Sequence, residues 1–292
     1  MGSNPAGRTT FPVTAPLSPP PNGTLEAWCW DLIHTPHLEY KLCPPAPPDP
    51  RTEEAWELAA VPRRIPRAVR PPCFQSIERS PKTPKPAALR DPKARALLLH
   101  TFLHHELQAA ELFAWAVLAF PETPRAFRTG LIRLCLEELE HLALYRARLA
   151  SLGHHAGDFP VRDWFWERVA TCETPAAFVA LQGLGLEGAN LEHSARFAAQ
   201  FRAAGDSDSA AVLEQVEREE IGHVAFAVQW FERLTGAPLD YRRWREALPE
   251  PLSPAVLQGK PINRKARLRA GLDEQFLQCL EAEPSTAIRR EA

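Results

Sequence analysis

Two short acidic stretches indicate the fold of this chain: Glu137-Glu138-Leu139-Glu140-His141 and Glu219-Glu220-Ile221-Gly222-His223. Each contains a Glu-x-x-His within a segment that is predicted to be helical. At a spacing of three residues, a carboxylate and an imidazole project from one helical face about one turn apart, so both can reach a single ion. One such pair is a weak signal, but two in one chain suggest a shared centre.

A lone glutamate precedes each Glu-x-x-His by nearly the same interval. Glu106 lies 32 residues before Glu138, and Glu187 lies 33 residues before Glu220. Turn signals interrupt both intervals near their middle, at residues 121–124 and 205–207. In an antiparallel hairpin, residues equidistant from the turn lie at the same height, so each hairpin places one glutamate opposite a Glu-x-x-His. The predicted metal ligands are Glu106, Glu138, His141, Glu187, Glu220 and His223.

Other acidic and imidazole residues compete for places in this set. Glu111 and Glu192 each follow a lone glutamate by five residues, which turns a helix by about 140°, so both members of such a pair cannot point inward. Glu106 is preferred because it shares an apolar stripe with Phe102 and Phe113, and Glu192 has Arg196 four residues later as a surface partner. The flanking residues expected on outer faces or in structural roles, with support of a ligand as the alternative, are Glu137, Glu140, Glu217, Glu219, His104, His105 and His193.

The ligand types favour two divalent ions of intermediate hardness. Carboxylates alone would suit magnesium or calcium, whereas two imidazoles move the preference toward iron, manganese or zinc. Burying several charged groups without a partner costs several kcal/mol each, and bound metal would relieve that cost. We therefore expect two iron ions, with manganese as the second choice. The sequence assigns no catalytic residue beyond the metal centre.

Glycines are unusually frequent beside the predicted ligands. Each glycine costs roughly 0.5 to 1 kcal/mol relative to alanine inside a helix, so a cluster of them needs a reason. One interpretation is close packing of helices. The other is that Gly185 or Gly188 leaves room beside Glu187 for dioxygen or substrate, walled by Leu184, Phe113 and Phe226. The glycines concerned are Gly183, Gly185, Gly188 and Gly222.

The order of predicted helices gives the fold class, which is all-α. Two helical hairpins joined by a longer crossover over residues 153–174 form the ferritin-like type of four-helix bundle, predicted over residues 92–236. Twenty of the thirty prolines lie in residues 1–92. We expect residues 1–24 to be a disordered tail, residues 25–91 to be a Pro-rich extension packed on the core, and residues 237–292 to be a C-terminal helical extension.

Composition excludes several classes of protein. The formal net charge of −2 gives no footprint of strong nonspecific nucleic-acid binding. The six cysteines are scattered without zinc-ligand spacing, as in reduced structural thiols of a cytoplasmic protein. Neither a secretion signal nor a membrane-spanning run of apolar residues is evident. Nothing in the sequence predicts an oligomeric state.

Residues 90–282 resemble the DUF455 family of ferritin-like proteins, and more remotely they are similar to di-iron hydroxylases such as the tRNA-modifying MiaE group. The resemblance covers about two thirds of the chain and excludes the Pro-rich head. It implies that Glu138 and Glu220 bridge the metals, that Glu106 and Glu187 are terminal ligands, and that His141 and His223 bind one ion each. The stretches that carry the resemblance are residues 105–109, 137–141, 185–190 and 219–223.

The expected function is that of a di-iron oxidoreductase, which activates dioxygen to hydroxylate or oxidise an organic substrate. No flavin or nicotinamide fingerprint occurs, so an external electron donor is implied. A small molecule is the default substrate, and the basic segments 63–70 and 260–269 keep RNA open as an alternative. The competing hypothesis is a ferritin-like metal-storage protein or a metal-stabilised interaction protein, in either case without catalysis of this kind.

Overall fold

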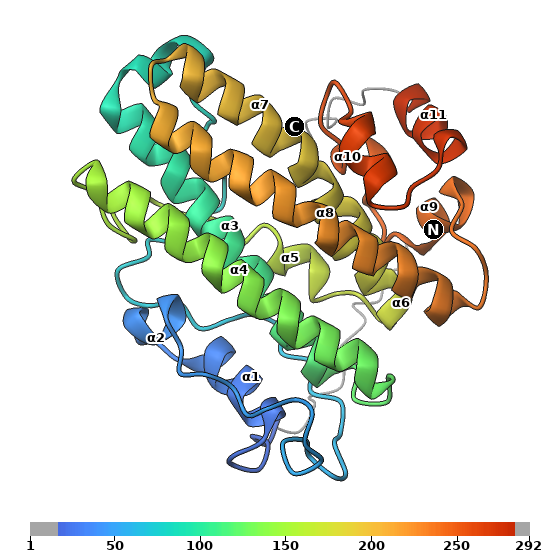
Figure 1. Ribbon diagram of the computed structural model, residues 1–292. Helices are drawn as coiled ribbons and strands as arrows, with labels where there is room; N and C mark the ends of the chain where they lie inside the picture. Colours follow the sequence, from blue (N-terminus) through green and yellow to red (C-terminus); the bar gives the residue numbers. More distant parts are fainter. Residues whose placement is uncertain (1–16, 284–292) are drawn as a thin grey trace, which may run out of the picture.

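The structure, a computed structural model, describes residues 17–283. These residues form an all-helical body without strands, in which one isolated β-bridge pairs Ser76 with Val161. Long helices run side by side through the molecule (Figure 1). They are α3 (Pro92–Ala119), α4 (Arg125–Ser151), α7 (Gly188–Ala203) and α8 (Ser207–Thr235).

The third long segment is composite. It begins with α6 (Pro175–Phe178), continues as the π-helical η2 (Val179–Glu187) and passes directly into α7. Thr174 caps its start by accepting a hydrogen bond from the Ala177 amide, and Pro175 occupies the first turn, as the sequence predicted. A π-helical stretch inside a longer helix commonly marks a functional site.

Shorter helices flank the long ones on opposite sides (Figure 1). Before α3 in the chain come α1 (Leu25–His34), α2 (Leu38–Leu42) and η1 (Pro86–Arg90). Helix α1 packs on α3, α2 packs on α4, and η1 contacts both α3 and α7. The crossover contains α5 (Trp166–Val169), beside α3. After α8 come α9 (Tyr241–Ala247), η3 (Pro254–Val256), α10 (Arg264–Arg269) and α11 (Glu274–Ala282), and α10 contacts both α7 and α8.

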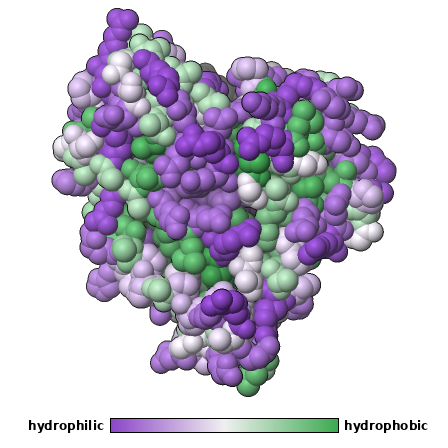
Figure 2. Space-filling view, in the orientation of Figure 1, coloured by the Kyte–Doolittle hydropathy of each residue, from purple (hydrophilic) through white to green (hydrophobic). Residues whose placement is uncertain are grey.

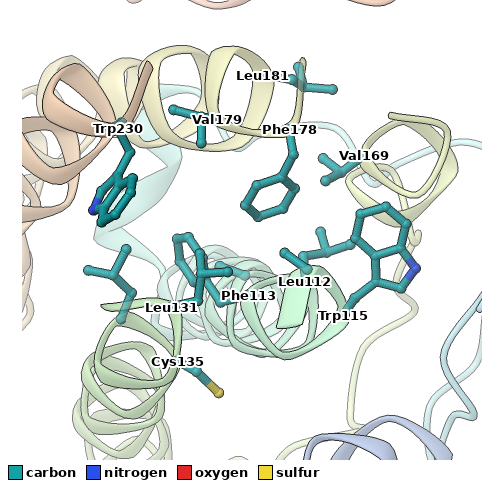
Figure 3. Packing of buried hydrophobic residues seen from close by; sticks show 14 of the residues in the cluster. Leu112, Phe113, Trp115, Leu131, Cys135, Val169, Phe178, Val179, Leu181 and Trp230 are labelled. Atoms are coloured by element: carbon teal, nitrogen blue, oxygen red, sulfur yellow. The ribbon is translucent and has the colours of Figure 1, made fainter. Parts of the chain in front are cut away.

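Two apolar cores lie one beyond the other along the long helices. On α3, residues 96–107 contribute to the first core, and residues 109–119 contribute to the second, together with Phe120 just after the helix. Helices α4 and α8 change core in the same way, between residues 139 and 142 and between residues 216 and 224. Figure 3 shows part of the second core, where Phe113 of α3 faces Phe178 of α6 with ring centroids 6.2 Å apart. The predicted ligands therefore fall where the two cores meet.

The N-terminal extension is packed on the long helices over its described part. Leu25, Trp28 and Ile65 are buried in the second core, and the Arg63 side chain donates to the carbonyl of Ser18 at 2.8 Å. Residues 1–16 of the predicted tail lie outside the described residues. The division of the chain into four segments stays a prediction.

Most large apolar side chains are used in these cores. On the face shown in Figure 2, hydrophilic residues cover much of the outer edge, and hydrophobic residues appear in smaller patches between them. Across residues 17–283, no helix combines the length and the apolar character needed to cross a membrane. All six cysteines are free thiols, three of them buried.

Candidate metal centre

The structure brings all six predicted ligands together in one buried layer between the two cores. Glu106 comes from α3, Glu138 and His141 come from α4, Glu187 ends η2, and Glu220 and His223 come from α8. Two groups of ligand atoms form, and within each group all atoms lie within 4.8 Å of one another. The first group is Glu106, Glu138, His141 and Glu220, and the second is Glu138, Glu187, Glu220 and His223.

Glu138 and Glu220 belong to both groups. The two groups therefore form one site with two adjacent positions, and not two separate sites. They come from the Glu-x-x-His of α4 and the Glu-x-x-His of α8, so the two helices contribute equivalently. The His141 and His223 rings face each other at an interplanar angle of 27°, with centroids 5.6 Å apart. Six buried side chains of this composition could hold metal ions.

Several polar atoms at this centre are buried without a hydrogen-bond partner among the described residues. They include both carboxylate oxygens of Glu138, one oxygen of Glu220, and the Nδ1 atoms of His141 and His223. The His223 Nδ1 lies 2.9 Å from Glu138 Oε1 and 3.1 Å from Glu220 Oε2. Buried polar groups are nearly always satisfied, so this convergence of lone pairs fits a cation better than a polar core without one.

The other ring nitrogen of each histidine is held by a carboxylate from the opposite helix. His141 Nε2 donates to Glu219 Oε2 at 2.9 Å, and His223 Nε2 donates to Glu137 Oε2 at 2.9 Å. With the proton on Nε2, the Nδ1 lone pair faces inward, which is the tautomer that a metal requires. From the sequence, Glu137 and Glu219 were expected on the outer faces of their helices, with support of a metal ligand as the alternative. Glu137 and Glu219 are indeed partly exposed, but both contact a histidine.

The charges of the centre disturb one another strongly. Burial, together with the neighbouring Glu138, raises the pKa of Glu106 well above its usual range, and burial and Glu220 do the same for Glu187. Burial opposes ionisation of Glu138, but His223 and His141 in their protonated forms outweigh it and lower the pKa of that carboxyl. Buried carboxyl groups whose pKa values are shifted in opposite directions within one layer are typical of functional sites.

Two amides extend the layer, and neither was singled out from the sequence. Gln182 donates to Glu187 at 2.5 Å across one turn of the π-helix, and Asn190 donates to Glu220 at 2.9 Å. Asn190 lies three residues after Glu187, the same spacing as in the Glu-x-x-His pairs. That spacing was the available signal for Asn190, whereas Gln182 depends on the π-helical geometry.

The competing glutamates are buried but point away from the centre into ion pairs. Glu111 accepts from Lys41 at 2.6 Å and from Arg70 at 2.7 Å. Glu192 is paired with Arg267 at 2.7 Å. The predicted surface pair of Glu192 with Arg196 is wrong, because the Glu192 carboxylate is buried and its oxygens accept from Arg267 and from backbone amides at Gly259 and Asn263.

The glycines support close packing and not open space beside Glu187. A Cβ on Gly185 would lie 2.9 Å from the Leu257 side chain, and one on Gly188 would lie 3.1 Å from that of Arg267. The predicted room beside Gly185 or Gly188 is therefore filled by residues that follow α8. Gly183 faces Ala227 of α8 in the same way.

A cavity of about 420 Å³ nevertheless reaches the centre from another side. Its lining includes Glu106 and Glu187, and also His105 and His193, for which the sequence favoured structural roles. Burial lowers the pKa of His105 to about 3 and that of His193 to about 4, so both imidazoles are neutral near pH 7. His104 instead faces Gln108 and Asp163 in a buried polar network, in keeping with a structural role.

Comparison with known proteins places this chain in a family. The model described as "Protein of unknown function (DUF455)" matches residues 48–278, and the chain belongs to that family. This match begins farther toward the N-terminus than the motifs suggested, so it includes part of the Pro-rich segment. An uncharacterized protein of Haemophilus influenzae is 27% identical over 191 residues, which are 62% of this chain and 66% of that protein. No solved structure matches.

Proposed function

We propose that this member of the DUF455 family is a ferritin-like dinuclear metal protein, with iron in both positions, that activates dioxygen to hydroxylate or oxidise an organic substrate. The observation that carries the proposal is the pair of ligand groups that share Glu138 and Glu220. Two helical hairpins that converge on such a layer are typical of the ferritin-like di-iron carboxylate class.

The residues divide into roles by their place in the two groups. Glu138 and Glu220, common to both, would bridge the ions. Glu106 and His141 would complete one position, and Glu187 and His223 the other. Oxygen and imidazole donors without thiolate suit iron first and manganese second. When bound, the pair of ions would supply redox-active metal at which dioxygen can be reduced.

The protein's own contribution is orientation and exclusion of water. Glu137 and Glu219 hold the imidazoles with Nδ1 inward, and the two apolar cores close the layer on both sides. Hydroxylation by dioxygen leaves one oxygen atom in the product and the other in water, which consumes two electrons and two protons. The sequence has no dinucleotide fingerprint, so the electrons would come from an external donor.

The alternative is a ferritin-like metal-binding or metal-stabilised interaction protein without catalysis. The cavity favours an enzyme, because its lining includes the two terminal glutamates and its volume of about 420 Å³ is within the usual range for small-molecule sites. A purely structural metal would need no such access. For the same reason a small molecule is favoured over RNA.

The test combines metal content with dioxygen uptake. Protein loaded with ferrous ion without oxygen should hold two iron ions per chain, and it should consume dioxygen when a chemical reductant is supplied. Glu138→Ala should lose iron and activity, whereas Glu140→Gln, an exposed change on the same helix, should alter neither. Full iron content without dioxygen uptake under any reductant would instead support the non-catalytic alternative.

A further inference from the structure

The cavity that reaches Glu106 and Glu187 has mainly aromatic and aliphatic walls. Phe102 of α3 and Phe197 of α7 lie with ring centroids 5.1 Å apart, and Phe165 of the crossover lies 4.8 Å from the ring of His105. Walls of this kind bind planar or apolar groups through burial and ring contacts. The apolar side chains of the lining include Leu98, Phe102, Trp164, Phe165, Leu186 and Phe197.

Few charged groups face this cavity. Glu106 and Glu187 belong to the candidate metal centre. Arg196 is the one Lys or Arg among the lining residues that the structure describes. The cavity therefore has a carboxylate end and a cationic end.

Arg196 has no acidic partner within ion-pair distance among residues 17–283. Its nearest candidate, Glu192, is neutralised by Arg267 and by two backbone amides. The Arg196 guanidinium lies over the Phe197 ring, 4.7 Å from its centroid. This contact leaves the guanidinium edge, which matches a carboxylate or phosphate in a two-pronged hydrogen bond, free to bind.

The two ends are well separated. Arg196 follows Glu187 by nine residues, which corresponds to about 13 Å along a helix. His193 lies between them on α7 and lines the same space. A ligand that touched both ends would have to be elongated.

We propose that the cavity binds an elongated, largely aromatic or apolar molecule with an anionic group, carboxylate or phosphate, held by Arg196. The body lies between the aromatic walls, beside the imidazoles of His105 and His193, which line the same space. The opposite end is presented to Glu106 and Glu187. That last feature rests on the proposed function, because it makes this end the site of oxidation, whereas binding of the anion by Arg196 does not depend on it.

A second cavity complicates the assignment, since Arg196 also lines it. This space of about 770 Å³ lies between η1, α7 and residues 260–263, and its lining includes Arg90, Ala199 and Lys260. Two alanines of α7 separate the cavities experimentally. Ala189 lines only the cavity at the metal centre, and Ala199 lines only the second one.

Calorimetric titration of the full-length protein provides the test, with biphenylacetate, its neutral analogue biphenylacetamide, and naphthyl phosphate as probes. At least one anion should bind about tenfold or more tightly than the amide, and the tighter of the two identifies the preferred anionic group. Arg196→Gln should remove this preference. Arg202→Gln, an exposed arginine of the same helix that pairs with Glu214, is the matched control and should keep it.

The alanine variants locate the bound probe. Ala189→Leu should weaken binding and Ala199→Leu should not. Equal affinity for anion and amide, an unchanged preference in Arg196→Gln, or loss of binding in Ala199→Leu alone would overturn the proposal. Metal content is measured in the same samples, so preserved anion binding in a protein that takes up no iron would contradict the proposed function and leave the ligand assignment standing.

Discussion

Removing the carboxylates that hold the two histidines should weaken metal binding without removing a ligand. In Glu219→Gln, the amide can no longer act as a full anionic acceptor for His141 Nε2, a contact of 2.9 Å. Glu137→Gln has the same effect on His223. Without that acceptor the imidazole loses its fixed tautomer, and part of its population turns a protonated Nδ1 toward the ion.

The size of the effect follows from the exposure of the two carboxylates. A hydrogen bond to a charged group contributes about 1.5 to 3 kcal/mol when buried. The side chains of Glu137 and Glu219 are 39% and 45% exposed, so water screens both contacts and reduces their contribution to the bottom of that range or somewhat below it. We expect a loss of about 1 to 2 kcal/mol for each change, or roughly a 5- to 30-fold weaker affinity.

Competition with a chromophoric chelator measures this affinity directly. Each single variant should shift the competition curve, and the double variant should shift it farther. Glu140→Gln is the matched control, because Glu140 lies between the two ligands of α4 in sequence but is exposed. Affinities equal to that of the unchanged protein in both single variants would refute a role for these carboxylates in orienting the histidines.

Three further predictions concern proton uptake, ion pairing and packing. Burial and the neighbouring carboxylates raise the pKa of Glu106 and of Glu187, so bound metal must displace protons. Its affinity should therefore rise with pH, and a binding heat that does not depend on the buffer's ionisation enthalpy would contradict this. Arg267→Met leaves the buried Glu192 without its cation and should lower the free energy of unfolding by about 3 to 5 kcal/mol in urea titrations. A loss no larger than that of the control Arg264→Gln, which removes a partly exposed arginine of the same helix, would exclude this. A Cβ on Gly183 would lie 2.4 Å from that of Ala227, whereas one on Gly222 meets nothing within 4 Å. Gly183→Ala should thus destabilise the protein by about 1 to 3 kcal/mol, and Gly222→Ala should stabilise it by about 0.5 to 1 kcal/mol; shifts of the same sign would refute the packing argument.

The helical class and the boundaries of the long helices could be predicted because they depend on local signals. Pro92 and the turn at residues 121–124 bound α3, and Gly236 ends α8 with φ at 68°, in the left-handed region. The π-helical geometry of η2 could not be predicted in this way. Its glycines pack against residues that are distant in sequence, Gly183 against Ala227 of α8 and Gly185 against Leu257 of the C-terminal segment.

The six residues that meet at the centre could be recognised from the sequence, because residues equally distant from the turn of a helical hairpin lie at the same level along its two helices. Their partners were harder to assign. Glu137 and Glu219 are adjacent in sequence to Glu138 and Glu220 and should point elsewhere on their own helix, yet each reaches a histidine of the opposite helix. This contact depends on how α4 and α8 pack against each other, which the residue pattern of a single helix does not show.

The ion pairs of Glu111 and Glu192 likewise could not be predicted from one helix, because their cations come from the segments that flank the long helices. Glu111 lies five residues after Glu106 and Glu192 lies five residues after Glu187, and both are buried. The cations that neutralise Glu111 come from the segment before α3, as Lys41 and Arg70. The cation for Glu192 is Arg267, from α10. Because an unpaired buried carboxylate is strongly destabilising, the helices that carry Glu106 and Glu187 depend on residues far outside the four long helices. The family match over residues 48–278 covers Arg70 and Arg267 and begins after Lys41, so it includes one of the two cations that pair with Glu111 and the cation that pairs with Glu192.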